Sequence, residues 1–185
     1  GRVSFTGEMG YEMWVTSEYL RTLYDLLHEA GKAHGLKNFG GRALNSLRLE
    51  KSFGNWAREF RPIYGPYEAG LGRFVHLDKA DFIGKAAAAA EKASGGVRKL
   101  ITLAVDAKDA DAIGDEPIWH GDKVVGWVTS GGYGHTVGKS IALGYVDNAV
   151  AGETNGFAVE LMGERRAAVR SAEALVDPQG LRMRS

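Results

Sequence analysis

The sequence has 185 residues, 44% of them hydrophobic and 25% charged, so it can bury the core of one large domain or two small ones. Its 23 basic and 23 acidic side chains balance, so net charge gives no attraction to nucleic acid, an anionic membrane or a polyanionic substrate. The absence of cysteine excludes a disulfide framework, a thiolate zinc site, an iron–sulfur cluster and a cysteine nucleophile in these residues.

The N-terminal part of the chain predicts two short strands around a glycine-rich connection, followed by two helices. Strand-like patterns at 3–5 and 13–15 flank the turn-prone segment 6–10. From residue 17 to about residue 34, apolar side chains recur at helical spacing, which indicates an amphipathic helix. A second helix is predicted over residues 42–51, directly after a pair of glycines.

The rest of the chain predicts one further helix and then a change of period. Residues 86–93 are strong helix formers, and their helix ends at Ser94-Gly95-Gly96. From Val97 onward the apolar pattern has period two, and His120-Gly121-Asp122 and Met162-Gly163-Glu164 are typical of hairpin turns. We therefore expect a small antiparallel barrel or sandwich, with a domain boundary near residues 94–96. The strands predicted by this pattern are residues 100–105, 124–129, 141–146, 157–161 and 167–171.

The start of the sequence has neither an initiating methionine nor the basic and apolar regions of a signal peptide. Because a strand-like pattern begins almost at once, at Val3, we expect the chain to be a piece of a longer protein. No run of eighteen or more apolar residues occurs, so we expect a soluble protein with no membrane partner.

Metal and phosphate sites are not indicated by the sequence. The five histidines are scattered, and no two of them have the spacing of metal ligands, so we predict no metal. Residues 131–135 resemble a phosphate loop superficially, but they lack its Lys-Ser/Thr ending and its strand-to-helix context. We interpret them as a connection between strands.

The segments that carry a resemblance to a known family are residues 5–12, 42–50, 68–71, 81–85, 126–130 and 138–143. They occur in the order seen in glycine cleavage T-proteins, and this order is stronger evidence than any single segment. The variant Leu47-Arg48-Leu49-Glu50-Lys51, with Arg58-Glu59 and Arg61-Pro62, is more similar to the folate-binding part of dimethylglycine and sarcosine dehydrogenases than to free T-proteins. The resemblance implies an α+β fold, in which residues 1–94 are the C-terminal portion of an aminomethyltransferase folate-binding domain and residues 97–182 are a small antiparallel β-barrel domain.

The resemblance also implies a chemistry. In this family a one-carbon unit, carried as an imine or aminomethyl group, is captured by tetrahydrofolate to give 5,10-methylenetetrahydrofolate. The implied partners are tetrahydrofolate, a small one-carbon donor and an upstream flavin domain of the same longer chain, which would hold FAD. The family's catalytic Asp belongs to a segment upstream of Gly1, so we expect no catalytic residue here and no activity of the chain alone. The implied compartment is the bacterial cytoplasm or, in a eukaryote, the mitochondrial matrix.

Glu12 is the strongest candidate for folate binding. A pterin presents adjacent N–H donors, and one ionised carboxylate can accept two of them in charge-assisted hydrogen bonds. Gly10-Tyr11-Glu12 matches the glycine-aromatic-glutamate motif that the family uses for the pterin. Tyr11 either stacks near the pterin or fills the core. Phe5 stands where some relatives carry a tyrosine near the folate, so the aromatic face is kept but the hydroxyl is lost.

Arg42, Arg48 and Glu68 are weaker candidates for folate binding. The resemblance places an arginine near the folate at Arg48, where it could pair with a carboxylate or the glutamyl tail, but a structural ion pair is equally consistent with the sequence. Arg42 is open to the same two interpretations, and Glu68 either reaches the cleft or caps the turn after Pro66. Three aromatic residues, which either line a site for a flat ligand or form part of the core, are Trp56, Tyr64 and Tyr67.

Other functions are open on the sequence alone. They are a free glycine cleavage T-protein, a folate-dependent demethylase that forms 5-methyl- rather than 5,10-methylenetetrahydrofolate, and a non-catalytic folate-binding module. A folate-dependent RNA-modification factor of similar fold carries a lysine-glycine-cysteine motif, which this sequence lacks because it has no cysteine.

Overall fold

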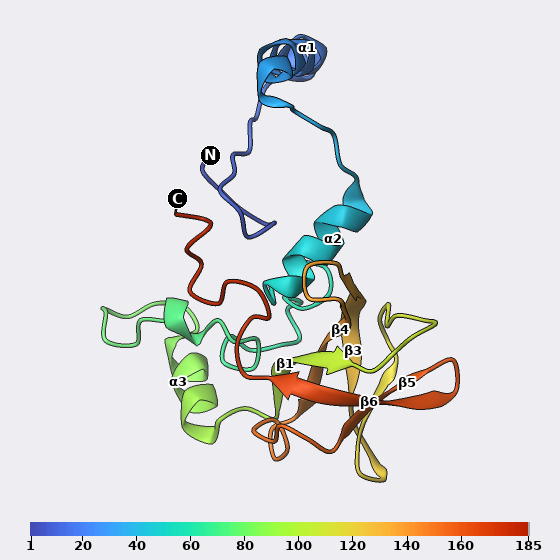
Figure 1. Ribbon diagram of the computed structural model, residues 1–185. Helices are drawn as coiled ribbons and strands as arrows, with labels where there is room; N and C mark the ends of the chain where they lie inside the picture. The colour runs from blue at the N-terminus through green and yellow to red at the C-terminus, as the bar shows by residue number, and fades with distance from the viewer. Residues whose placement is uncertain (185) are drawn as a thin grey trace.

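The computed structural model describes residues 1–184 and has two parts, a closed β barrel and an arm of helices and extended segments. Figure 1 shows the first helix standing away from the barrel, with an extended segment on either side of it. The two ends of the described chain lie near each other, because Arg2 donates a hydrogen bond to the backbone oxygen of Met183 at 3.3 Å.

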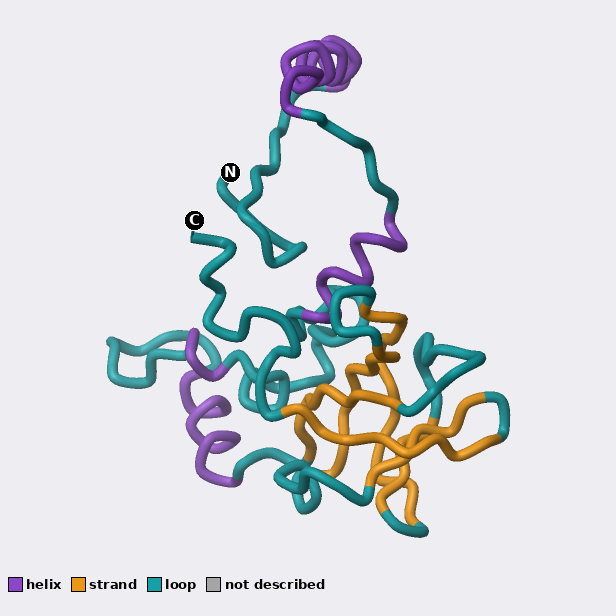
Figure 2. The backbone as a smooth tube through the Cα atoms, in the orientation of Figure 1, coloured by secondary structure: helices purple, strands orange, loops and turns teal. Residues whose placement is uncertain are grey.

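Six strands form the barrel in the order β1-β4-β3-β2-β5-β6, and all neighbouring pairs are antiparallel. Figure 2 shows the strands gathered in one body, with helices and long loops to one side of it. Because β6 pairs with β1, the sheet has no free edge. The strands are β1 (Arg98–Val105), β2 (Pro117–His120), β3 (Lys123–Gly134), β4 (Lys139–Asp147), β5 (Phe157–Leu161) and β6 (Glu164–Ser171).

The barrel closes around alternate apolar side chains of its strands. Leu103, Ile118 and Val128 are completely buried in this core. The turn from β5 to β6 places Met162 and Gly163 at φ angles of 50° and 84°, the left-handed conformation that a two-residue hairpin of this kind requires. The hairpin expected at this position from the sequence is therefore confirmed.

The helices differ in how they contact the barrel. In α1, none of the residues is buried. In α2, Leu49 is completely buried and packs against Ile141 and Leu143 of β4. In α3, Ala88 is the buried residue. The helical elements are η1 (Ser17–Tyr19), α1 (Leu20–Gly31), η2 (Lys32–His34), α2 (Gly41–Glu50), η3 (Gly72–Phe74) and α3 (Lys85–Ser94).

The long segment between α2 and α3 is fixed to the outside of the barrel. The ring of Tyr64 stacks on that of Tyr145 in β4, with centroids 3.8 Å apart and an interplanar angle of 19°. Ala69 belongs to the same buried cluster. The Tyr145 hydroxyl donates a hydrogen bond to the backbone oxygen of Glu59 at 2.8 Å. One barrel side chain therefore contacts this segment through both its ring and its hydroxyl.

The structure confirms the α+β fold, the helices and the barrel that the change of period predicts. The strands predicted at 3–5 and 13–15 are wrong, because these residues are irregular and only a reciprocal pair of hydrogen bonds joins Gly1 and Glu12. A two-stranded hairpin without a third strand is marginal in stability. The four-residue β2 is missed by the sequence pattern, and residues 131–134 belong to β3 rather than to a connection.

Glu68 holds the junction between α3 and β1. Its side chain is buried, and its carboxylate accepts hydrogen bonds from the backbone N–H groups of Gly65 at 3.3 Å, Val97 at 2.9 Å and Arg98 at 3.1 Å. The boundary near residues 94–96 stays a prediction. The Glu68 carboxylate accepts hydrogen bonds from residues on both sides of this predicted boundary, because Gly65 precedes it and Val97 and Arg98 follow it.

We expect Glu68→Ala to destabilise the protein, because three backbone donors lose an ionised acceptor. Hydrogen bonds to charged groups contribute about 1.5–3 kcal/mol, so the free energy of unfolding should fall by that order. Urea denaturation followed by circular dichroism measures the change. Glu18→Ala, at an exposed position, is the matched control. Equal stability of the two variants would show that the junction does not depend on this carboxylate.

Candidate functional site

A cavity of about 450 Å³ lies between the N-terminal loop and α2, and we call it the glycine-loop pocket. It brings together two sequence-predicted residues, Tyr11 and Glu12. The side chain of Glu12 is exposed and makes no hydrogen bond or ion pair with another residue of the described chain. Its carboxylate is therefore open to a ligand. The pocket is lined by residues 3–6 and 8–12 and by Phe39, Leu44 and Leu47.

The loop that forms this pocket is held by contacts of its own. The Ser4 hydroxyl donates to the backbone oxygen of Glu8 and accepts from the backbone N–H of Gly7 at 3.1 Å. Gly7 has a φ of 81°, and a Cβ added there would lie 2.3 Å from Cγ of Lys51. The turn therefore requires glycine for its conformation and for its close approach to the end of α2.

Arg48 is almost completely buried, with 3% of its surface exposed. Its guanidinium donates to the side-chain oxygen of Asn45 at 2.7 and 2.9 Å and to the backbone oxygen of Phe53 at 3.1 Å. Its Nη1 lies 3.5 Å from a carboxylate oxygen of Glu59. Burial lowers the pKa of Arg48, whereas the charge and hydrogen bond of Glu59 act in the opposite direction. Each nitrogen of the Arg48 guanidinium therefore has a partner inside the protein.

Glu59 is the acceptor at the centre of this network and has no exposed surface. Its carboxylate accepts hydrogen bonds from the backbone N–H of Asn55 at 2.6 Å and from the hydroxyl of Ser130 in β3. A buried carboxylate without such partners would be strongly destabilising. The pair that Glu59 forms with Arg48 thus links α2, the segment after it and the barrel.

The structure does not bring Arg42, Arg48 or Glu68 into the glycine-loop pocket. Arg42 is exposed in the first turn of α2, whereas the charges of the other two already have partners. Contact of these three residues with folate stays a prediction.

The three aromatic residues grouped by the sequence have different surroundings. Trp56 is 83% exposed, and Tyr64 is buried in its stack against the barrel. The hydroxyl of Tyr67 is buried and has no hydrogen-bond partner among residues 1–184. Of the three, Tyr64 therefore has the core role that the sequence left open.

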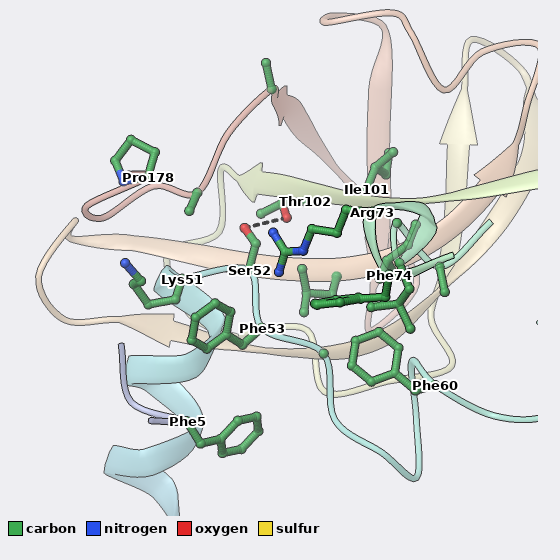
Figure 3. Close-up of a pocket in the computed structure, with 18 residues that line it drawn as sticks. Phe5, Lys51, Ser52, Phe53, Phe60, Arg73, Phe74, Ile101, Thr102 and Pro178 are labelled. Atoms are coloured by element: carbon green, nitrogen blue, oxygen red, sulfur yellow. Dashed lines mark hydrogen bonds between the residues drawn. The ribbon is translucent and has the colours of Figure 1, made fainter. Parts of the chain in front are cut away.

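A larger cavity, of about 640 Å³, lies between the end of α2, the segment after it, β1 and the C-terminal tail. We call it the phenylalanine pocket, because Phe5, Phe53, Phe60 and Phe74 line it, as Figure 3 shows. Phe5 lines both cavities. This pocket was not predictable from the sequence, because its walls come from residues spread over the whole chain.

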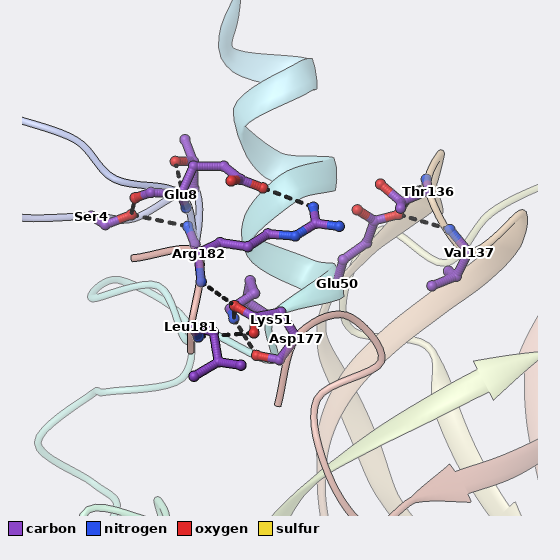
Figure 4. A network of polar contacts seen from close by, with 11 residues as sticks. Ser4, Glu8, Glu50, Lys51, Thr136, Val137, Asp177, Leu181 and Arg182 are labelled. Atoms are coloured by element: carbon purple, nitrogen blue, oxygen red, sulfur yellow. Dashed lines mark hydrogen bonds and ion pairs between the residues drawn. The ribbon is translucent and has the colours of Figure 1, made fainter. Parts of the chain in front are cut away.

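The C-terminal tail is tied to the residue after α2 and to the N-terminal loop by two ion pairs, which Figure 4 shows and which we call the C-terminal clasp. Lys51 Nζ lies 3.0 Å from the carboxylate of Asp177, and Arg182 Nη1 lies 3.0 Å from that of Glu8. The Asp177 carboxylate also accepts from the backbone N–H groups of Leu181 at 2.9 Å and Arg182 at 3.1 Å. The clasp thereby connects the loop of the glycine-loop pocket to the end of the chain.

The ion pairs of the clasp could not be predicted from the sequence, because Lys51 and Asp177 are 126 positions apart. Burial acts to raise the pKa of Asp177, but the hydrogen bonds from Lys51 and from the two backbone groups outweigh it and hold the pKa below its ordinary value. Beside the clasp, Glu50 accepts hydrogen bonds from the backbone N–H groups of Thr136 at 2.6 Å and Val137 at 3.1 Å. The end of α2 is therefore tied to both the tail and the β3–β4 turn.

Within residues 1–184, no group of three or more His, Asp or Glu side chains is arranged to hold a metal ion. In the same range, none of the helices combines the length and the apolar character that crossing a membrane requires.

Two family models match the chain. The model of the GCVT N-terminal domain matches residues 1–79, and that of the glycine cleavage T-protein C-terminal barrel domain matches residues 98–177. Together they cover both parts of the structure.

Known proteins match over most of the chain. Human mitochondrial dimethylglycine dehydrogenase is 44% identical over 176 residues, which are 95% of this chain and 20% of that protein. An aminomethyltransferase of Desulfitobacterium hafniense is 36% identical over 155 residues, which are 83% of this chain and 42% of that protein. The crystal structure of glycine cleavage system aminomethyltransferase T from Bartonella henselae matches with a TM-score of 0.84 at 26% identity, over 96% of this chain and 49% of that one. The chain thus spans about a fifth of the dehydrogenase and less than half of either aminomethyltransferase.

The clasp should weaken in acid. Because the pKa of Asp177 is lowered by folding, its stabilising effect is complete above the ordinary aspartate pKa of about 3.9 and is lost as the pH falls through the lower folded value. The difference in Tm between the wild type and Asp177→Asn should therefore be largest near neutral pH and shrink below about pH 4. Asp81→Asn, at an exposed position outside the clasp, is the control. A difference that is constant over this range would contradict the assignment.

Proposed function

The chain belongs to the glycine cleavage T-protein family, and we propose that it supplies part of the tetrahydrofolate site of an aminomethyltransferase of the kind found in dimethylglycine and sarcosine dehydrogenases. In the proposed reaction, the carbon of an imine or aminomethyl group becomes the methylene bridge of 5,10-methylenetetrahydrofolate, and the amine leaves. The observation that supports this proposal most directly is the unpaired carboxylate of Glu12 in a pocket whose volume, about 450 Å³, suits a small ligand.

The charges of the glycine-loop pocket suit a ligand edge made of N–H donors. Glu8 and Glu12 are the charged residues of its lining, and no lysine, arginine or histidine of the described chain lines it. Glu8 is paired with Arg182, so Glu12 is the carboxylate left to accept hydrogen bonds from a pterin. Tyr11, which is 63% exposed in the same pocket, offers its ring for stacking on a flat ligand.

The three remaining predicted residues have different parts in the proposed site. Arg42 is exposed and can contact a ligand directly. Arg48 and Glu68 act by holding the backbone that follows α2 and the backbone that leads into β1. We propose no catalytic residue in this chain. The carboxylate that moves protons near the reacting folate nitrogens is proposed to belong to the preceding half of the folate domain.

Two observations support a larger protein around this chain. The chain spans 20% of human dimethylglycine dehydrogenase and 42% of the matching aminomethyltransferase. Helix α1 has an apolar face, including Leu20, Tyr24 and Leu27, which are 41–55% exposed. Amphipathic helices of this length owe most of their stability to packing of the apolar face, so we infer that another segment covers it.

In the dehydrogenase version of this proposal, a flavin domain with FAD precedes the folate domain and oxidises the amine that donates the carbon. The human relative is named as mitochondrial, which supports the mitochondrial matrix as the compartment in a eukaryote. In a bacterium the proposed compartment is the cytoplasm. The proposed partners are thus the folate, the amine donor and the flavin domain.

Glu12→Gln should weaken binding of tetrahydrofolate by the protein that contains the whole folate domain. Loss of one charge-assisted acceptor corresponds to about 1.5–3 kcal/mol, or a Kd raised about 10- to 150-fold. Isothermal titration calorimetry measures the Kd. Glu18→Gln, at an exposed position outside the pocket, should leave it unchanged. Wild-type affinity in the Glu12 variant would remove this residue from the pterin site.

The 185-residue chain by itself should not form 5,10-methylenetetrahydrofolate from tetrahydrofolate and a one-carbon donor. A missing general acid or base lowers a rate by about two to four orders of magnitude, and an incomplete cleft weakens binding further. Product formation by this chain and by the protein with the whole folate domain is compared side by side. Comparable turnover would place the catalytic carboxylate within these residues. Formation of 5-methyltetrahydrofolate by the longer protein would instead identify a demethylase.

A further inference from the structure

We propose that Asn155 is a site of spontaneous covalent modification, at which the backbone nitrogen of Gly156 attacks the side-chain amide and the asparagine is converted to aspartate and isoaspartate. The inference is independent of the folate chemistry proposed above and concerns the turn that leads into β5. Its basis is the combination of an asparagine-glycine pair, an exposed turn and an amide without a hydrogen-bond partner in the described chain.

Asn155 differs from the other asparagines of the chain in its hydrogen bonding. The side chain of Asn148, for example, donates to the backbone oxygen of Gly96 at 3.2 Å. Asn155 is exposed, and its side chain makes no hydrogen bond with any other residue among 1–184. No contact therefore has to break before its amide carbon turns toward the following backbone nitrogen. The asparagines whose side chains do make hydrogen bonds are Asn38, Asn45, Asn55 and Asn148.

The residue after Asn155 favours the attack. Of the asparagines in the sequence, Asn155 is the one that a glycine follows. Glycine has no Cβ, so nothing hinders the approach of its backbone nitrogen to the preceding side chain. The backbone N–H of Gly156 precedes the first residue of β5 and makes no hydrogen bond with the rest of residues 1–184. Both reacting groups are therefore without a partner in the folded chain.

The fold requires glycine at this position. Gly156 has a φ of 86°, a left-handed conformation that other residues rarely adopt. A Cβ added there would lie 2.9 Å from Nε2 of His120, whose ring packs edge-on against that of Phe157 with centroids 4.9 Å apart. A larger residue would therefore strain the turn and displace the imidazole. The reactive pair is thus a consequence of the way the chain enters β5.

The reaction needs water as its only co-reactant. The Gly156 nitrogen loses its proton and forms a bond to Cγ of Asn155, while the bond from Cγ to Nδ2 breaks and ammonia leaves with that proton. The product is a cyclic imide. Water then adds to one of the two imide carbonyl carbons and opens the ring. Opening at the former side-chain carbon gives aspartate, whereas opening at the backbone carbon gives isoaspartate, in which the main chain runs through Cβ.

Isoaspartate changes the entry to β5, because hydrogen bonds fix the backbone on both sides of the reactive pair. The backbone N–H of Arg170 donates to the oxygen of Thr154 at 2.9 Å. That of Gly121 donates to the oxygen of Gly156 at 3.1 Å. Isoaspartate inserts one more carbon into the main chain between these two points, directly before Phe157, which is buried in the barrel core. Since β5 pairs with both β2 and β6, the longer chain weakens two pairings, whereas aspartate leaves the length of the main chain unchanged.

The test ages the folded 185-residue chain in mildly alkaline buffer, because the attack needs the deprotonated nitrogen. Mass spectrometry with peptide fragmentation follows each asparagine, and methyl transfer by an isoaspartate-specific methyltransferase measures that product separately. We expect position 155 to gain the mass difference between a hydroxyl and an amino group, while Asn148 in the same chain stays unchanged. Asn155→Gln, whose longer side chain closes the corresponding ring far more slowly, should lose the conversion and the methyl transfer.

Thermal denaturation measures the consequence for the barrel. Ageing should lower the Tm of the wild type and leave that of Asn155→Gln unchanged, since only the wild type acquires isoaspartate. Freshly prepared Asn155→Asp carries the new charge on a main chain of normal length, so its Tm should equal that of the fresh wild type. Conversion that is absent at Asn155, or equal at Asn155 and Asn148, would overturn the inference. Isoaspartate formation without a fall in Tm would overturn the effect on β5.

Discussion

The arrangement of this protein depends on two opposite charges buried where α2, the segment after it and the barrel meet. Taking a charged group out of water costs several kcal/mol per ion, and the attraction between two ions offsets this only when the remaining polar atoms also have partners. Arg48 and Glu59 meet that condition, because backbone and side-chain groups on three elements complete their hydrogen bonding. Since the pair fixes the chain from Phe53 to Glu59, it also sets the wall of the larger cavity.

Pairing of charges also determines what each cavity can attract. Glu8 and Lys51 lie in the linings of the two cavities, but the C-terminal tail supplies a counter-ion for each of them. The charges that stay open are the carboxylate of Glu12 and the guanidinium of Arg73. The two cavities therefore have opposite charge character, although Phe5 lines both of them. The tail neutralises one charged side chain in the lining of each cavity and adds no unpaired charge to either lining.

The elements that the sequence predicts correctly are those set by local pattern. The helical spacing of 17–34 and the period two of the barrel strands depend on neighbours within one element, so a single sequence reveals them. The strands expected at 3–5 and 13–15 fail because a strand needs a partner, and the reciprocal backbone hydrogen bonds near them join Gly1 and Glu12 rather than the two predicted strands. β2 is too short, and begins with a proline, for its period to stand out.

The same reasoning explains which parts of the site could be found. Glu12 and Tyr11 share a pocket because they are adjacent in a motif. The partners of Arg48 lie 3 to 11 positions away and those of Glu68 lie 3 to 30 positions away. The charge of each residue is visible in the sequence, but the groups that it binds are not. For Arg73, the sequence indicates no function, whereas the structure shows an unpaired charge in a cavity. Arg73 belongs to no motif, and only the folded chain shows that its charge is left open.

The C-terminal clasp has a consequence for how the protein is made on the ribosome. The last barrel strand ends at Ser171, before the residues of the clasp that come from the tail. Since a chain emerges from its N-terminus, Glu8 is exposed to the cell during the synthesis of everything that separates it from Arg182. All six barrel strands can therefore emerge before Glu8 gains its ion pair with Arg182. A chain cut between residues 171 and 177 would keep all six barrel strands and lose the counter-ions of both Lys51 and Glu8.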